Sequence, residues 1–315
     1  MDIEMLRERA RITRETRAFF DGRGYLETDT PLLSGSLIPE SCLEVFMTER
    51  MLPGGKKRKP YWLVPSPEIW MKRLIAGHRT DIYQICKCFR NGESSGHLHS
   101  PEFTMLEYYT MNADYLDSLS LTEDLLRALR RALRPFPPLL RITVADAFAE
   151  WAGFDLYRAA EEGSLAEEAR RLGLDPPPSL DTGGLYDLIF IHAVEPNLPR
   201  ENPVALMDYP AFVPCLAKKG KDGRTAERWE LYINGVELAN CYSEETDPEE
   251  VRRYFALEGE AKKKNALVDH AVDEDYWKIF QSFPACSGVA LGLDRLVMTI
   301  AGRRSIDAVL PFPVI

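Results

Sequence analysis

Two arginines beside glycine-containing turns are the first residues in this sequence that suggest a chemical task. Arg90 stands in the run FRNGE, and Arg295 stands in GLDRL. A guanidinium can hold a phosphate or carboxylate through two parallel hydrogen bonds. We expect Arg295 in the first turn of a helix, where free N–H groups favour anions, and Gly292 lets a ligand approach the backbone. Either arginine alone is typical of a structural ion pair, but together, near many carboxylates, they favour a nucleotide site.

A second group of chemically active residues lies in the run ELANCYSEE. It contains Glu237, Asn240 and Glu244. Carboxylates at this density repel one another unless they hold magnesium or a cationic substrate. We therefore predict Glu237 and Glu244 as metal ligands. Strict alternation along a strand puts Glu237 on the face opposite Asn240 and Glu244, so one shared site requires a bulge or strand end that breaks the period.

The third group surrounds a polar loop in the run FRNGESSGHLHSPEFTMLEYY. The flanking segments read as two strands, and alternation then puts Phe103, Met105, Glu107 and Tyr109 on one face. A carboxylate and a phenol suit a pocket wall better than a core. Glu68, in the run SPE, adds another carboxylate at a strand end. These acidic groups predict a ligand that carries an ammonium group.

Two simpler interpretations of the same loop stay open at this point. It resembles an ordinary hairpin with a polar tip, and His97 and His99 have a spacing that a metal site could use. A zinc site at Cys86 and Cys88 is disfavoured, because a C-x-C run without a second pair is a poor zinc signature. We expect all six cysteines to be reduced thiols.

The elements that must position these groups alternate between strands and helices. In the first part of the chain, the periodicity, glycines and prolines predict a helix at Ile3–Phe20, an extended segment at Tyr25–Ser34, and strands at 60–68, 81–91 and 101–111. Helices follow from Tyr115 to about Leu180. The last part is predicted to contain a hairpin with an Asn-Gly turn at 227–245, a charged helix at Pro248–Lys264 and, after a glycine-rich strand, a helix with Asp294 as its N-cap. The helices between 115 and 180 are expected to form an insertion rather than a separate core.

Composition and charge narrow the function classes. The chain has 315 residues, 45% of them hydrophobic and 28% charged, which is ordinary for a globular protein. It contains neither a signal-peptide core nor about 18 consecutive apolar residues, so we expect no membrane association and a cytoplasmic protein. The net charge of -10 argues against a dedicated nucleic-acid binder.

Three of these runs resemble the motifs of class II aminoacyl-tRNA synthetases. YLETDTPLL resembles motif 1, whose proline lies at a dimer interface, and FRNGE with SPEFTMLEYY resembles motif 2. GVALGLDRLVM resembles motif 3. The lysyl branch is the most similar, through SPEIWMKRL, PEFTMLEYY and ELANCYSEETDP. The resemblance implies an α+β class II catalytic fold over residues 1–315, with an antiparallel sheet flanked by helices and a helical insertion between motifs 2 and 3.

The resemblance also implies roles for individual residues and the use of ATP and Mg2+. Arg90 would hold the α-phosphate and Arg295 the γ-phosphate, as the two catalytic residues, and Phe103 would stack on adenine. The full ATP-binding set it implies is Arg90, Asn91, Glu93, His99, Ser100, Phe103, Glu237, Leu238, Gly292 and Arg295. The implied substrate-binding set is Ser66, Glu68, Glu107, Tyr109, Asn240, Glu244 and Ala290.

The short length of the chain makes it most similar to one branch of the family. Lysyl-tRNA synthetases carry an oligonucleotide-binding barrel before the catalytic domain, whereas the motif 1 helix here starts near residue 3, so we expect no anticodon-binding domain. The chain resembles the elongation factor P–(R)-β-lysine ligases. Lysyl-tRNA synthetases usually carry glycine at the position of Ala290. The resemblance implies transfer of β-lysine or lysine to elongation factor P, a homodimer, and no tRNA partner.

Two alternatives to that function remain. The first is a free-standing lysine-activating enzyme that charges tRNA or a small molecule. The second is a catalytically silent paralogue, which the retention of Arg90, Glu237, Glu244 and Arg295 disfavours.

Overall fold

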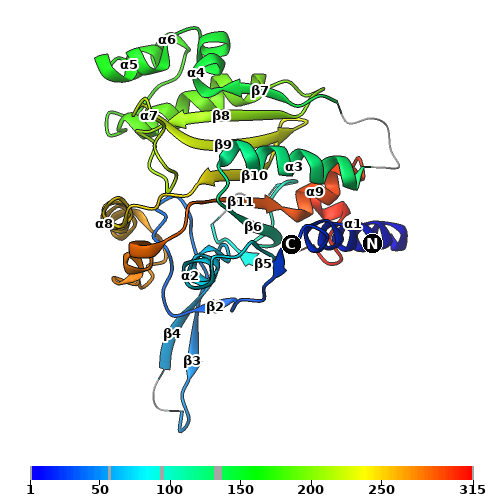
Figure 1. Ribbon diagram of the computed structural model, residues 1–315. Coiled ribbons are helices and arrows are strands. Elements are labelled where there is room, and N and C mark those ends of the chain that lie inside the picture. The colour runs from blue at the N-terminus through cyan, green and yellow to red at the C-terminus, as the bar shows by residue number, and fades with distance from the viewer. Residues whose placement is uncertain (1, 56–57, 93–95, 131–136, 314–315) are drawn as a thin grey trace.

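An eight-stranded sheet forms the centre of the protein, and a computed structural model describes residues 2–55, 58–92, 96–130 and 137–313 of the chain (Figure 1). The strands in spatial order are β1 (Leu26–Glu27), β5 (Ile82–Phe89), β6 (Glu102–Met111), β11 (Cys286–Gly292), β10 (Val236–Ser243), β9 (Thr225–Ile233), β8 (Val204–Pro210) and β7 (Leu140–Thr143). The six central strands, from β5 to β8 in this spatial order, pair antiparallel with one another. The two edge strands, β1 and β7, pair parallel with β5 and β8. The predicted antiparallel sheet flanked by helices is therefore confirmed.

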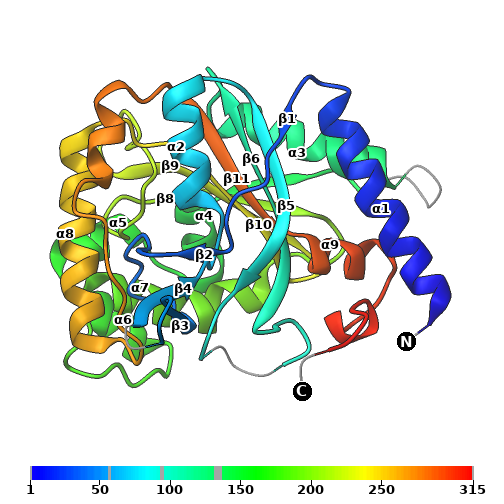
Figure 2. The same cartoon turned by 90° about the horizontal axis from the view of Figure 1, so that it is seen from below.

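Helices cover the two faces of the sheet (Figure 2). One side carries α1 (Ile3–Asp21), α3 (Tyr115–Leu129) and α9 (Leu293–Ile300), and the other carries α2 (Glu68–His78), α8 (Pro248–Asn265) and the 3₁₀ helix η4 (Tyr276–Ser282). Helix α1 turns Met5, Ile12, Phe19 and Phe20 into the main core, and the seven-residue steps between the first three keep them on one face of the helix. The predicted helices Ile3–Phe20 and Pro248–Lys264 are confirmed to within one residue.

The region between α3 and β9 differs from the predicted insertion. Helix α3 belongs to the main core, because it packs on α1 and on β9, β10 and β11. The helices beyond it continue to Asn197 and form a second hydrophobic cluster on the sheet, in which Phe148 stacks on Tyr186 at a centroid distance of 5.3 Å. They are α4 (Val144–Ala147), η1 (Phe148–Ala152), α5 (Leu156–Glu162), α6 (Leu165–Arg171), α7 (Thr182–Ile189), η2 (Phe190–Val194) and η3 (Glu195–Asn197). These short helices bury their aromatic residues against β8, so their cluster also contains residues of the central sheet, such as Val204 and Leu206.

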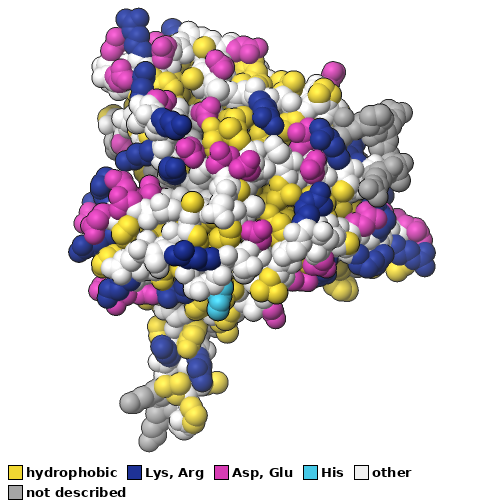
Figure 3. All heavy atoms as spheres, in the orientation of Figure 1, with side chains coloured by type: hydrophobic (Ala, Val, Ile, Leu, Met, Phe, Trp, Pro, Cys, Tyr) yellow, Lys and Arg dark blue, Asp and Glu magenta, His cyan; other side chains and the backbone are white. Residues whose placement is uncertain are grey.

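A small second sheet projects from the main body (Figure 1). Its strands, in spatial order, are β2 (Leu33–Ser34), β4 (Arg58–Leu63) and β3 (Met47–Met51). Met47 and Met51 expose 57% and 69% of their surfaces there. Elsewhere on this face, basic and acidic side chains are interspersed (Figure 3), as expected of a solvated surface. None of the helices in the described part of the chain is long and apolar enough to cross a membrane.

Two local features near the site bear on the sequence predictions. The Asn-Gly turn is confirmed, because Asn234 and Gly235 have φ values of 55° and 74° and join β9 to β10. The prediction of Asp294 as an N-cap is wrong, since Gly292 occupies that position. Asp294 is buried in the first turn, where it accepts a hydrogen bond from the Thr104 amide (2.7 Å) and pairs with Arg9 (2.6 Å). The carboxylate therefore ties α9 to β6 and α1.

Candidate active site

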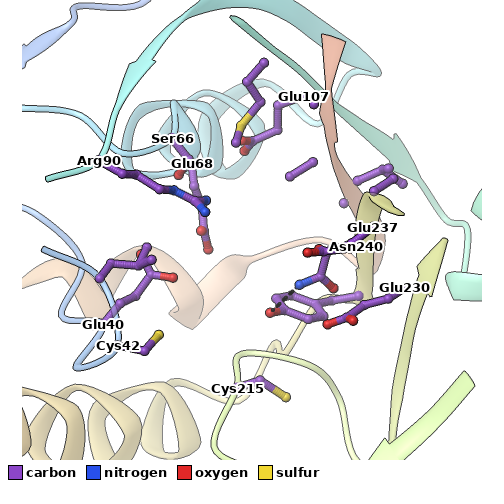
Figure 4. A pocket seen from close by; sticks show the side chains of 18 of the residues that line it. Glu40, Cys42, Ser66, Glu68, Arg90, Glu107, Cys215, Glu230, Glu237 and Asn240 are labelled. Carbon is purple, nitrogen blue, oxygen red and sulfur yellow. Dashed lines mark hydrogen bonds between the residues drawn. The ribbon is translucent and has the colours of Figure 1, made fainter. Parts of the chain in front are cut away.

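A cavity of about 610 Å³ opens on the sheet face opposite α1 and α3, because Leu106 and Tyr108 of β6 pack in the core with those helices while Glu107 and Tyr109 line the cavity. Figure 4 shows side chains that line it. Its walls come from β6, β9, β10 and β11, from α2 and α8, and from the loop before β3. Eight of the predicted ATP-binding residues line it: Arg90, His99, Ser100, Phe103, Glu237, Leu238, Gly292 and Arg295. All seven predicted substrate-binding residues line it as well: Ser66, Glu68, Glu107, Tyr109, Asn240, Glu244 and Ala290.

One predicted ATP-binding residue, Asn91, has a different role in the described structure. Asn91 is not among the described residues of the cavity wall, because its amide donates to the Glu44 carbonyl (2.9 Å) and its side chain to the Val45 carbonyl (3.4 Å). It therefore fastens the loop before β3 to the end of β5. Glu93 lies outside the described residues.

One end of the cavity brings the two predicted anion-binding arginines together with an aromatic face. Arg90 directly follows β5, and its guanidinium carbon lies 5.3 Å from the centre of the Phe103 ring on β6. Arg295, in the first turn of α9, donates to the carbonyls of Glu237 (2.7 Å) and Leu98 (3.2 Å) and lies 2.9 Å from His99 Nε2. A positively charged, aromatic end of this kind suits the phosphates and the base of a nucleotide.

A bulge in β10 resolves the periodicity problem posed by Glu237. The register against β9 shifts between Glu237 and Ala239, so that Glu237 faces Tyr232 and Asn240 faces Glu230. The extra residue returns Glu237 to the face that carries Asn240. The expectation that the period is broken is confirmed.

The metal prediction needs a correction, because Glu237 and Glu244 lie at opposite ends of β10. The two residues are seven positions apart along a strand that contains one bulge, so their backbones are separated by roughly 20 Å. That distance is too long for the two carboxylates to share one ion. Glu230 instead faces the Glu237 end: burial and the charge of Glu230 raise the pKa of Glu237 to about 7, against the opposing effect of Arg295 and Arg90. Sequence analysis did not select Glu230, because only the pairing of β9 with β10 brings it there.

Two carboxylates that repel one another provide the hard oxygen ligands that Mg2+ prefers. Within the described residues, no group of three or more His, Cys, Asp and Glu side chains is arranged to hold a metal ion by itself. Glu230 and Glu237 therefore fit an ion that also takes ligands from a phosphate or from water.

The other end of the cavity is acidic, and a buried ammonium group lies behind two of its carboxylates. Lys72 of α2 is only 1% exposed, and its Nζ lies 2.6 Å from Glu68 and 2.7 Å from Glu244. Tyr109 donates a hydrogen bond to Glu107 (2.8 Å), and the second oxygen of Glu107 is buried without a hydrogen-bond partner in the described structure. Sequence analysis missed Lys72, although its position four residues after Glu68 on a helix could have indicated the pair.

The protonation of this acidic wall is strongly affected by its burial. Burial raises the pKa of Glu244 to about 7, although Lys72 lowers it. Burial, and after it the charge of Glu68, raises the pKa of Glu107 well above its ordinary value. A cationic ligand would favour the ionised form of these carboxyl groups, as Lys72 already does for Glu244.

A glycine on β11 makes room for this acidic end. Gly288 pairs with Tyr109, and a Cβ atom added there would lie 2.3 Å from a Glu244 oxygen and 2.6 Å from the Tyr109 ring. Two positions along, Ala290 pairs with Glu107 and contributes its methyl group to the same wall. The floor of the acidic end is therefore shaped by small residues.

Comparisons with known proteins agree with this geometry. The family described as "tRNA synthetases class II (D, K and N)" matches residues 3–315. An elongation factor P–(R)-β-lysine ligase of Avibacterium paragallinarum is 38% identical over 314 residues, which are 99% of this chain and 96% of the relative. The proteins of that name from Pasteurella multocida and Haemophilus influenzae (strain PittGG) are 38% and 37% identical, over 98% and 99% of this chain and 95% and 96% of theirs. The chain thus belongs to the class II tRNA synthetase family and, within it, to the elongation factor P–(R)-β-lysine ligases.

Proposed function

We propose that this protein activates (R)-β-lysine with ATP as an acyl-adenylate and transfers the β-lysyl group to a lysine side chain of elongation factor P. The observation that carries the proposal is the charge of the acidic end. Glu68, Glu107 and Glu244 supply three carboxyl groups, and Lys72 supplies one ammonium. When ionised, the group has a formal charge of -3 + 1 = -2, which two ammonium groups of a diamino acid would neutralise.

The cationic end of the cavity supports the nucleotide part of the proposal. Arg90 neutralises the α-phosphate while the substrate carboxylate attacks it, and Phe103 stacks on adenine. Arg295, oriented by its bonds to the Glu237 and Leu98 carbonyls, holds the γ-phosphate. Positioning and charge neutralisation then supply the rate acceleration, since phosphoryl chemistry of this kind needs little covalent help from the protein.

Glu230 and Glu237 are the residues that we propose hold Mg2+. When bound, the ion neutralises charge on the phosphates and fixes their orientation. The remaining proposals follow the same resemblance: a homodimer, built through the segment around Pro31, that acts in the cytoplasm without a tRNA partner.

Pyrophosphate exchange with a panel of amino acids tests the proposed substrate. We expect (R)-β-lysine or lysine to be activated, and norleucine to be rejected by a factor of about 10⁴, because a neutral side chain leaves buried carboxylates without a partner. Equal exchange with norleucine and with a diamino acid would contradict the assignment of the acidic end.

A further inference from the structure

Glu40 lies in the loop between β2 and β3 and is a cavity residue to which the activation step gives no task. Its backbone is anchored on α8, since Lys262 donates to the Glu40 carbonyl (3.1 Å) and the neighbouring Ser41 amide donates to Glu258 (2.8 Å). Its carboxylate lines the cavity and accepts no hydrogen bond from any residue that the structure describes. The loop is therefore held in place while this one acidic group faces the cavity.

The position of Glu40 corresponds to the junction between the two ends of the cavity. The Asn91 amide donates to the Glu44 carbonyl (2.9 Å), which holds the loop beside Arg90. The charges of Arg90 and Glu68 both act on Glu40, and Figure 4 shows the three side chains approaching one another from three separate elements. In an acyl-adenylate, the acyl carbon connects the α-phosphate to the amino-acid part. We therefore expect the acyl carbon between Arg90 and Glu68, at the place that the Glu40 side chain faces.

We propose that Glu40 takes the proton from the acceptor lysine during the transfer step, an inference that rests on the proposed function. The acceptor lysine arrives as an ammonium ion. It gives one proton to the Glu40 carboxylate and becomes a neutral amine. The nitrogen lone pair forms the new C–N bond at the acyl carbon, and the bond from that carbon to the phosphate oxygen breaks. The second nitrogen proton goes to the departing phosphate, so the products are the amide, AMP and protonated Glu40.

The surroundings of Glu40 suit this task. Burial, and after it the charge of Glu68, raises the pKa of Glu40 to about 7, while Arg90, Lys262 and Lys72 act in the opposite direction. Tyr242 of β10 and Tyr254 of α8 also lie within its electrostatic reach. A general base is most effective when its pKa lies near the working pH. Glu40 meets that condition at neutral pH.

The variant Glu40→Gln tests the inference when transfer is measured separately from activation. Enzyme carrying preformed β-lysyl-adenylate is mixed with elongation factor P, and the same enzyme is mixed with hydroxylamine, which is a neutral amine at pH 7 and needs no base. We expect transfer to the factor to fall about 100-fold or more, while hydroxamate formation changes only a few-fold. Hydroxamate formation also shows that the variant is folded.

The pH dependence provides a signature that a structural role for Glu40 would not produce. Wild-type transfer should rise with pH and level off above about 7, as Glu40 ionises. In Glu40→Gln, transfer depends on free amine, so it should continue to rise roughly tenfold per pH unit. Glu260→Gln is the matched control, because it removes a negative charge from α8 at an exposed position outside the cavity lining; we expect transfer within about twofold of wild type.

Three results would overturn the inference: transfer by Glu40→Gln within a few-fold of wild type, hydroxamate formation that falls as far as transfer does, or a plateau near pH 7 that persists in the variant. The failure of the proposed function is recognisable in the wild type alone. If wild-type enzyme forms the adenylate but modifies no lysine amine of elongation factor P, the proposed acceptor and this inference both fall. If wild type and Glu40→Gln modify it equally fast, only the inference falls.

Discussion

Replacement of the buried ammonium group is the perturbation with the largest effect that the acidic end predicts. Lys72 is 1% exposed and contacts both Glu68 and Glu244 at less than 3 Å. Lys72→Met keeps much of the volume but leaves the buried Glu244 and the half-buried Glu68 without their cation. Removing one partner of a buried ion pair costs about 3–5 kcal/mol. We therefore expect a loss of this size in the free energy of unfolding at pH 8.

The cost should depend on pH, because Glu244 can take up a proton. Its pKa is already about 7 in the folded protein, and Lys72 is the main group that lowers it. Without Lys72 this pKa rises further above its unfolded value, so the folded state binds more protons than the unfolded state over a wider range. Stability then falls as pH rises through that range. The variant should lose less stability at pH 6 than at pH 8.

Urea unfolding of wild type and Lys72→Met at pH 6 and pH 8 measures both effects. Lys72→Met combined with Glu244→Gln is the matched control, since it removes one of the stranded charges and should recover part of the loss at pH 8. A Lys72→Met protein as stable as wild type at both pH values would refute the account of the ion pair.

Four further outcomes follow from the site geometry. Gly288→Ala should abolish amino-acid-dependent pyrophosphate exchange with little change in circular dichroism, because its methyl group would collide with Glu244; unchanged exchange would contradict the placement of the substrate. Glu230→Gln should raise the Mg2+ concentration needed for half-maximal exchange, whereas the same change at Glu244 should act mainly on the KM for the amino acid. Arg295→Ala should lower pyrophosphate exchange by about 10-fold or more, because it removes a charge-assisted contact of roughly 1.5–3 kcal/mol. If the variant exchanged pyrophosphate as fast as wild type, Arg295 would not belong to the ATP site. In calorimetric titrations, β-lysine affinity should rise with pH through 7, since an ammonium binds the ionised form of Glu244; affinity that falls over this range would contradict the raised pKa.

Features that depend on local patterns could be predicted from the sequence. The face that carries Phe103, Glu107 and Tyr109 follows from two-residue alternation, and all three residues line the cavity. The Asn-Gly turn follows from the preference of those residues for positive φ. The bulge at Glu237 could be anticipated as a conflict between period and chemistry, although only the strand pairing shows where the extra residue lies.

Features that depend on tertiary pairing could not be predicted in this way. Glu230 became a partner of Glu237 only through the pairing of β9 with β10, and Glu40 reached the cavity only through a loop anchored on α8. Asp294 was assigned as a cap because its local context allows one, but the long-range ion pair with Arg9 determines its position. Long-range contacts of this kind leave no periodic signal in a single sequence.

The most direct test of the central claim is mass spectrometry of purified elongation factor P after incubation with this enzyme, ATP, Mg2+ and (R)-β-lysine. The factor should gain the mass of one β-lysyl group on a single lysine, and omission of ATP or (R)-β-lysine should abolish the gain. An unmodified factor, together with efficient charging of lysine tRNA by the same enzyme, would contradict it.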